Sequence, residues 1–135
     1  LLLETIRGLK QGTLRPQEQD EAQATLAPIL KKEDGLIDWR GSAVEIERRV
    51  RGFDPWPGSY TYLAGKLLKV HRAKIVSSEF AGSPGEIVHA QGDAFWVRTS
   101  SGVIALEEVQ AENKKRLPAA EFIKGARIKA GDRLG

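Results

Sequence analysis

The chain has 135 residues, of which 41% are hydrophobic and 29% are charged, and its formal net charge is +3. This length is enough for one hydrophobic core but not for a two-domain enzyme. The absence of cysteine excludes disulfides and thiolate chemistry, and two histidines are too few for the usual zinc cage, so we expect no metal. No apolar run approaches the ~20 residues of a membrane span, so we expect a soluble, cytoplasmic protein.

The first stretch of the chain predicts a helix followed by a polar connector. Leu2, Ile6 and Leu9 fall at positions i, i+4 and i+7, which is one stripe of a helix. That stripe has no apolar partner nearby, and the sequence does not begin with methionine. We therefore expect a piece of a longer chain, in which residues 1–24 are the end of a preceding domain plus a linker and residues 25–135 form one domain.

A second helix is predicted to start at Ser42. This serine and Glu45, three residues later, form a capping box, and an apolar stripe follows at helical spacing. The favoured explanation for the arginines of this helix is that they form ion pairs with glutamates of the same helix. Glu45 with Arg49, and Glu47 with Arg51, both have the favourable i, i+4 spacing.

After residue 58 the pattern changes to short β-prone runs separated by turn residues. At least five strands are expected, over residues 59–63, 67–76, 86–90, 94–99 and 103–109. Phe95 and Val97 alternate with Trp96 and Arg98, which suits a half-buried strand. A short helix over 118–124 follows, with Gly125 expected to end it. Five or six strands with one to two helices suit a small open Greek-key barrel of the OB type. We therefore predict a mainly β fold, preceded by the linker and a stray N-terminal helix.

Basic residues gather in two parts of the chain. Residues 31–74 contain ten Lys and Arg against six Asp and Glu, and residues 113–133 contain seven against two. Such stretches either meet an anionic partner or form an ordinary solvated face.

Four stretches stand in a specific order and spacing. They are QDEAQATLAPILKKEDGLIDW at 19–39, FDPWPGSYT at 53–61, PGEI at 84–87, and VQAENKKRLPAAEFIKG at 109–125 followed by AGDRL at 130–134. Together they resemble the C-terminal domain of the methionyl-tRNA formyltransferase family. Residues 1–24 then correspond to the end of the last helix of the family's catalytic domain and the linker.

The resemblance implies a parent enzyme that transfers a formyl group from 10-formyltetrahydrofolate to the amino group of methionyl initiator tRNA. The family's catalytic Asn, His and Asp belong to the N-terminal domain, and this chain has one asparagine, Asn113, and no Asn-x-His. We therefore expect no catalytic residue and no cofactor in this fragment, and no activity by the fragment alone. Its expected partners are initiator methionyl-tRNA and the N-terminal catalytic domain of its own chain, with no membrane.

The residues expected to carry this role are basic, because proteins bind nucleic acid mainly by neutralising phosphates. The pair Lys114 and Lys115 matches the family's Gln-x-Ala-Gly-Lys-Lys signature. Asn113 replaces the glycine of this signature, and asparagine tolerates the positive φ of such a turn. Lys31 and Lys32, which we call the linker lysines, lie where the chain enters the barrel. The expected tRNA-binding residues are Lys114, Lys115, Arg116, Lys31 and Lys32.

Two tryptophans of these motifs have two interpretations. Trp39 and Trp56 can stack on an unpaired base, as aromatic residues of OB barrels do. Packing in the core is the favoured interpretation for both, because large aromatic side chains usually anchor packing.

Two other functions are compatible with the same pattern. A sugar-nucleotide formyltransferase or formyltetrahydrofolate dehydrogenase carries a similar domain, and such a parent has no tRNA to bind. A free-standing OB-type interaction module is the other alternative, and it would depend on exposed aromatic residues.

Overall fold

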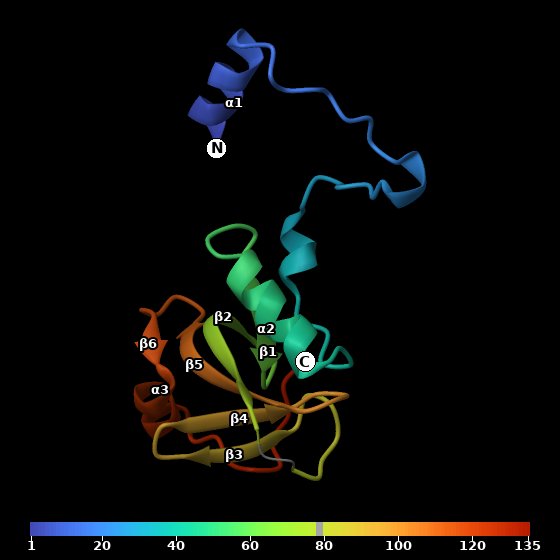
Figure 1. The fold of residues 1–135 in the computed structure, drawn as a ribbon. Coiled ribbons are helices and arrows are strands. Elements are labelled where there is room, and N and C mark those ends of the chain that lie inside the picture. The colour runs from blue at the N-terminus through green and yellow to red at the C-terminus, as the bar shows by residue number, and fades with distance from the viewer. Residues whose placement is uncertain (78–79) are drawn as a thin grey trace.

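The computed structural model describes residues 1–77 and 80–135 and shows an antiparallel sheet covered by helices, with an extended segment leading to an N-terminal helix (Figure 1). The strands are β1 (Ser59–Leu63), β2 (Lys66–Val76), β3 (Ile87–Gln91), β4 (Ala94–Arg98), β5 (Val103–Ala111) and β6 (Leu117–Pro118). The helices are α1 (Leu2–Lys10), α2 (Ala43–Gly52) and α3 (Ala119–Ala126), with short 3₁₀ turns η1 (Glu21–Gln23) and η2 (Lys32–Gly35). The predicted mainly β class is confirmed.

The sheet has the strand order β1-β2-β5-β4-β3, and β6 pairs with β5. Strand β4 shows the expected period of two, since Phe95 and Val97 are fully buried while Trp96 and Arg98 are half-buried. Helix α2 packs on β2, and α3 packs against β5 and β4. The core therefore lies between the curved sheet and these two helices.

Helix α2 begins as predicted. The Ser42 hydroxyl accepts a hydrogen bond from the Glu45 amide at 3.2 Å, and the Glu45 carboxylate accepts one from the Ser42 amide at 2.8 Å. The Ser42 amide and the Ser42 hydroxyl both donate to the Glu45 carboxylate, and these two bonds lower the pKa of Glu45. Ile46 and Val50 bury the apolar stripe of the helix, so the local start signal and the packed face agree.

The C-terminal residues bridge the two edges of the sheet. Leu134 pairs with Leu63 at the end of β1, and Arg133 pairs with Glu86 beside β3. The Leu134 amide donates to the Gly85 carbonyl at 2.8 Å, and the Leu134 side chain is only 4% exposed. The tail thus fills the gap that β1 and β3 leave open.

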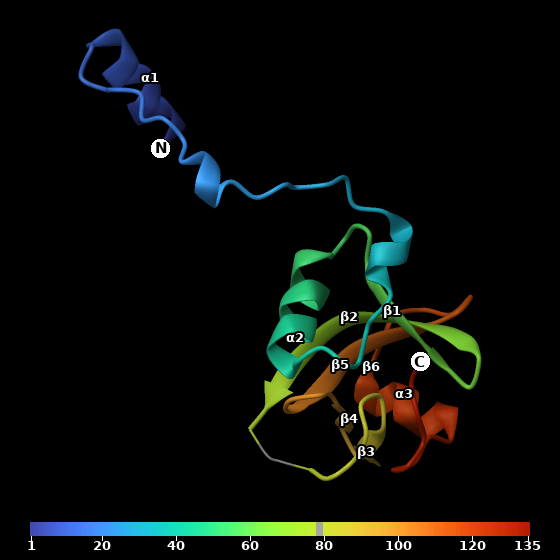
Figure 2. The same ribbon diagram turned by 90° about the vertical axis from the view of Figure 1, so that its right-hand side faces the viewer.

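Helix α3 ends one residue later than predicted, and helix α1 stays apart from the rest of the domain. Helix α3 does not end at Gly125 as predicted but at Ala126, because Arg127 takes the left-handed conformation with φ +51°. Helix α1 has no buried residue and lies away from the sheet in both views (Figures 1 and 2). The domain boundary after residue 24 stays a prediction.

Over the described residues, no helix combines the length and apolar character that crossing a membrane requires.

Candidate nucleic-acid interface

The loop between β5 and β6 carries the predicted lysine pair. Asn113 adopts φ +57°, so it takes the left-handed position expected for it. The Lys114 amide donates to the Ala111 carbonyl at 3.0 Å and closes the turn. Lys114 and Lys115 are both exposed, and within the described residues neither has an ion-pair partner. The turn therefore presents two solvent-facing cations.

Gln110 fixes this loop to the sheet. Its Nε2 donates to the Lys114 carbonyl at 2.8 Å, and its Oε1 lies 3.0 Å from Nε2 of His71 on β2. Because an amide oxygen only accepts, His71 carries its proton on Nε2 in this contact. Sequence reasoning did not assign a role to Gln110, although it is the first residue of the signature that contains the lysine pair.

Arg116 has a different environment from the lysines. Its guanidinium donates to the Glu108 carboxylate on β5, with Nε at 3.1 Å. The bonded guanidinium lowers the pKa of Glu108. Arg116 is therefore engaged in a surface ion pair, which leaves Lys114 and Lys115 as the stronger candidates for phosphate contacts.

The loop between β5 and β6, residues 112–116, is called the lysine loop, and it forms one wall of an open groove of about 960 Å³. The β1–β2 hairpin, α3 and the residues after α3 form the other walls. The charged lining residues are Lys66, Lys114, Lys115, Arg127 and Arg133, together with Glu121 and Asp132. The apolar ones include Leu63, Leu67, Leu117, Phe122 and Ile128. The groove thus combines apolar lining residues, which we call its floor, with predominantly cationic lining residues, which we call its walls.

The linker lysines lie elsewhere on the molecule. Lys31 and Lys32 are exposed at the start of η2, where the Asp34 carboxylate accepts a hydrogen bond from the Lys31 amide at 2.7 Å. Turn η2 lies beside α2, apart from the loop between β5 and β6 (Figures 1 and 2). The structure therefore brings Lys114, Lys115 and Arg116 together and places the linker pair on a separate part of the surface.

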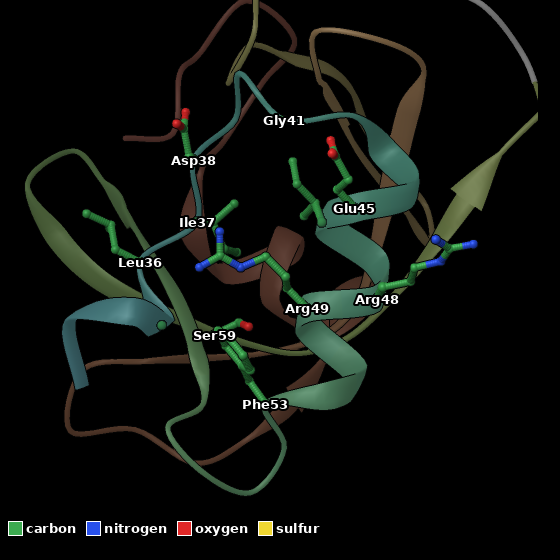
Figure 3. A pocket seen from close by; sticks show the side chains of 11 residues that line it. Leu36, Ile37, Asp38, Gly41, Glu45, Arg48, Arg49, Phe53 and Ser59 are labelled. Atoms are coloured by element: carbon green, nitrogen blue, oxygen red, sulfur yellow. The ribbon is translucent and has the colours of Figure 1, made fainter. Parts of the chain in front are cut away.

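A second, smaller hollow of about 400 Å³ separates α2 from the segment after η2. Arg49 reaches across it from α2, while Arg48 points away (Figure 3). Nη2 of Arg49 donates to the Asp34 carbonyl at 2.7 Å, and its guanidinium carbon lies 5.2 Å from the centre of the Phe53 ring. Arg49 thus ties turn η2, where the chain enters the domain, to helix α2.

The predicted ion pairs of α2 form only in part. Arg51 pairs with Glu47 at 3.1 Å, as predicted. The pairing of Arg49 with Glu45 is wrong, because the Glu45 carboxylate caps the helix at Ser42.

Replacing Arg49 by alanine is expected to lower the free energy of unfolding by about 1 to 2 kcal/mol, because a charge-assisted hydrogen bond and a cation–π contact are lost at an exposed site. The Leu36 amide, which donates to the Glu33 carbonyl within η2, should exchange faster with solvent. Arg48→Ala is the matched control and should change stability by less than about 0.5 kcal/mol. Equal effects of the two changes would contradict the role of Arg49.

The two tryptophans have opposite environments. Trp39 is 5% exposed, and its indole N–H donates to the Thr61 hydroxyl at 3.1 Å, which confirms its packing role. Trp56 is 61% exposed, so the prediction that it plugs the core is wrong. The Gly58 amide donates to the Phe53 carbonyl at 2.9 Å, and the turn that this bond closes carries Trp56 on its outside.

Among the residues that the structure describes, no group of three or more His, Asp or Glu side chains is arranged to hold a metal ion. The groove beside the β5–β6 loop offers exposed cations next to apolar side chains.

Comparison with known proteins shows long similarities to formyltransferases. The chain is 48% identical over 136 residues to a methionyl-tRNA formyltransferase of Acidobacterium capsulatum, covering 100% of the chain and 43% of that protein. It is 46% identical over 132 residues to the enzyme of that name from Geobacter sulfurreducens, covering 98% of the chain and 41% of that protein. The chain thus spans less than half the length of these relatives.

Solved structures with the same fold include HypX from Aquifex aeolicus. A substituted variant matches with a TM-score of 0.61 at 25% identity, over 92% of this chain and 23% of HypX. HypX in complex with tetrahydrofolic acid matches with a TM-score of 0.60, also at 25% identity and over the same shares of the two chains. Residues 29–127, which include η2, the whole sheet and the lysine loop, match the family described as formyl transferase, C-terminal domain, and the chain belongs to this family.

Proposed function

We propose that this chain is the tRNA-binding part of a cytoplasmic methionyl-tRNA formyltransferase. The whole enzyme would transfer a formyl group from 10-formyltetrahydrofolate to the amino group of methionyl initiator tRNA. The names of the relatives support this proposal, since 42 to 48% identity extends over nearly the whole chain. In this proposal the catalytic groups belong to an N-terminal domain, and the present chain supplies tRNA affinity without catalysing the transfer alone.

The observation that carries the proposal is the geometry of the lysine loop. The left-handed Asn113 and the Gln110 side chain hold the turn, so Lys114 and Lys115 project from a fixed part of the sheet. Phosphate groups need such cations on one surface, and binding releases the counterions that had condensed on the nucleic acid. These contacts position the tRNA without reading its bases.

Changing Lys114 and Lys115 together to alanine should weaken tRNA binding about tenfold or more near 0.1 M salt. Each lost contact should also reduce the slope of log affinity against log salt by roughly 0.7 to 0.9. Affinity measured by fluorescence anisotropy at several salt concentrations checks both values.

The matched control is the double change Lys69→Ala and Lys124→Ala, which removes two exposed lysines that are not among the groove residues. The control should change affinity by about twofold at most. An unchanged affinity and slope in the Lys114/Lys115 variant, with the fold retained, would reject this loop and direct attention to Lys31 and Lys32.

A second candidate function follows from the match to HypX. The same fold occurs there as about a quarter of a larger protein whose structure is known with tetrahydrofolic acid. In this alternative the domain belongs to a formyltransferase that acts on a substrate other than tRNA. Absence of salt-dependent tRNA binding by the unmodified protein would favour it.

A further inference from the structure

We propose that the groove between the β1–β2 hairpin, the β5–β6 loop and α3 binds unpaired nucleotides, with bases on the apolar floor and phosphates on the cationic walls. This inference rests on the proposed tRNA-binding function and adds to it a site for single-stranded segments. A double helix presents its phosphates outward and keeps its bases stacked inside, so it can contact only the rim. Unpaired nucleotides expose both parts.

The charges around the groove favour an anionic ligand. Lys114 and Lys115 line one wall, and Arg127 and Arg133 line the wall formed by the residues after α3. Of the two carboxylates in the lining, that of Asp132 accepts a hydrogen bond from the Lys129 amide at 3.0 Å. Cations from two separate segments of the chain therefore line the groove, which suits a phosphate backbone running along it.

The floor offers a flat aromatic surface. Phe122 of α3 is half-buried and lines the groove, and its ring stacks on the fully buried Phe95 with centroids 6.1 Å apart and planes 16° from parallel. A base placed on the outer side of Phe122 would add a further layer to this stack. The half-buried Leu67 and Leu117 also line the groove and add apolar surface for a base.

An acidic amphipathic peptide is the competing occupant of a groove with these properties. The position of the lysine loop favours nucleic acid. Lys114 and Lys115 belong both to this groove and to the surface proposed to contact tRNA phosphates, so a bound tRNA already brings its backbone to the rim.

Gly125 provides a clean test because it lines the groove and a Cβ atom added there meets no atom within 4 Å. Gly125→Glu and Gly125→Gln have the same size and differ in charge. The probes are a five-nucleotide single-stranded RNA and a blunt RNA duplex. We expect Gly125→Glu to bind the single strand about tenfold more weakly than Gly125→Gln, with a smaller change for the duplex.

Phe122→Leu tests the aromatic floor while keeping an apolar side chain. We expect about a tenfold loss of single-strand affinity, in line with the removal of one stacking partner, and an unchanged affinity for the duplex. Circular dichroism establishes that each variant is folded. The Gly125 pair keeps the test valid if Phe122→Leu disturbs the core.

The outcomes separate this inference from the proposed function. Single-strand binding that ignores both Gly125→Glu and Phe122→Leu would overturn the groove site, while duplex binding that still depends on Lys114 and Lys115 would leave the tRNA function standing. Single-strand binding that is sensitive to the groove changes, with tRNA binding that ignores the lysine pair, would support the groove and reject the proposal that Lys114 and Lys115 supply the affinity for tRNA. Binding of an acidic helical peptide in place of the single strand would also overturn the proposal.

Discussion

Replacing Trp39 by alanine is expected to lower the free energy of unfolding by about 3 to 5 kcal/mol, whereas the same change at Trp56 should cost less than about 0.5 kcal/mol. Trp39 is 5% exposed and belongs to the core, so its removal leaves a large cavity. Trp56 is 61% exposed, and water already covers most of its surface. Urea unfolding followed by far-UV circular dichroism measures both values without depending on tryptophan fluorescence.

Trp39→Phe separates packing from hydrogen bonding at this site. It retains most of the apolar volume but removes the indole N–H that bonds the buried Thr61 hydroxyl. An intermediate loss of about 1 to 3 kcal/mol is expected, because that hydroxyl loses its donor. Similar losses for alanine at positions 39 and 56 would contradict the two environments described for the tryptophans.

Gly85→Ala and Leu134→Ala should each destabilise the domain by about 2 to 5 kcal/mol. A Cβ atom at Gly85, where φ is +84°, would lie 2.6 Å from the Leu134 carbonyl oxygen, so the tail would have to move. Leu134→Ala instead leaves a cavity in the place of a side chain that is 4% exposed. Both changes disturb the bridge between β1 and β3 by different physical means.

Arg133→Ala is the control for these two changes. Its side chain lies on the surface and donates to the Pro84 carbonyl at 3.1 Å, so a loss of about 1 kcal/mol or less is expected. Denaturant midpoints for the three variants give the comparison. If Gly85→Ala and Leu134→Ala cost no more than Arg133→Ala, the tail does not contribute to the core as described.

Local sequence patterns determined the secondary-structure elements and the turn at Asn113. The Ser42–Glu45 capping box predicted the start of α2, because both hydrogen bonds join residues three apart. Alternation in β4 predicted which side chains face the core, since side chains of a strand point to opposite faces in turn. Asn113 was expected at a left-handed turn, because its conformational tolerance is a property of the residue itself.

Only the tertiary structure decided features that depend on residues distant in the sequence. Trp39 and Trp56 both lie in family motifs, but only Trp39 meets a partner from β1, Thr61, 22 positions away. Arg49 contacts the Asp34 carbonyl, 15 positions away, in place of Glu45. The groove and the C-terminal bridge likewise arise where separate segments meet. The spacing of residues within one segment carries no information about these long-range contacts, because chain folding and the competition for hydrogen-bond partners decide them.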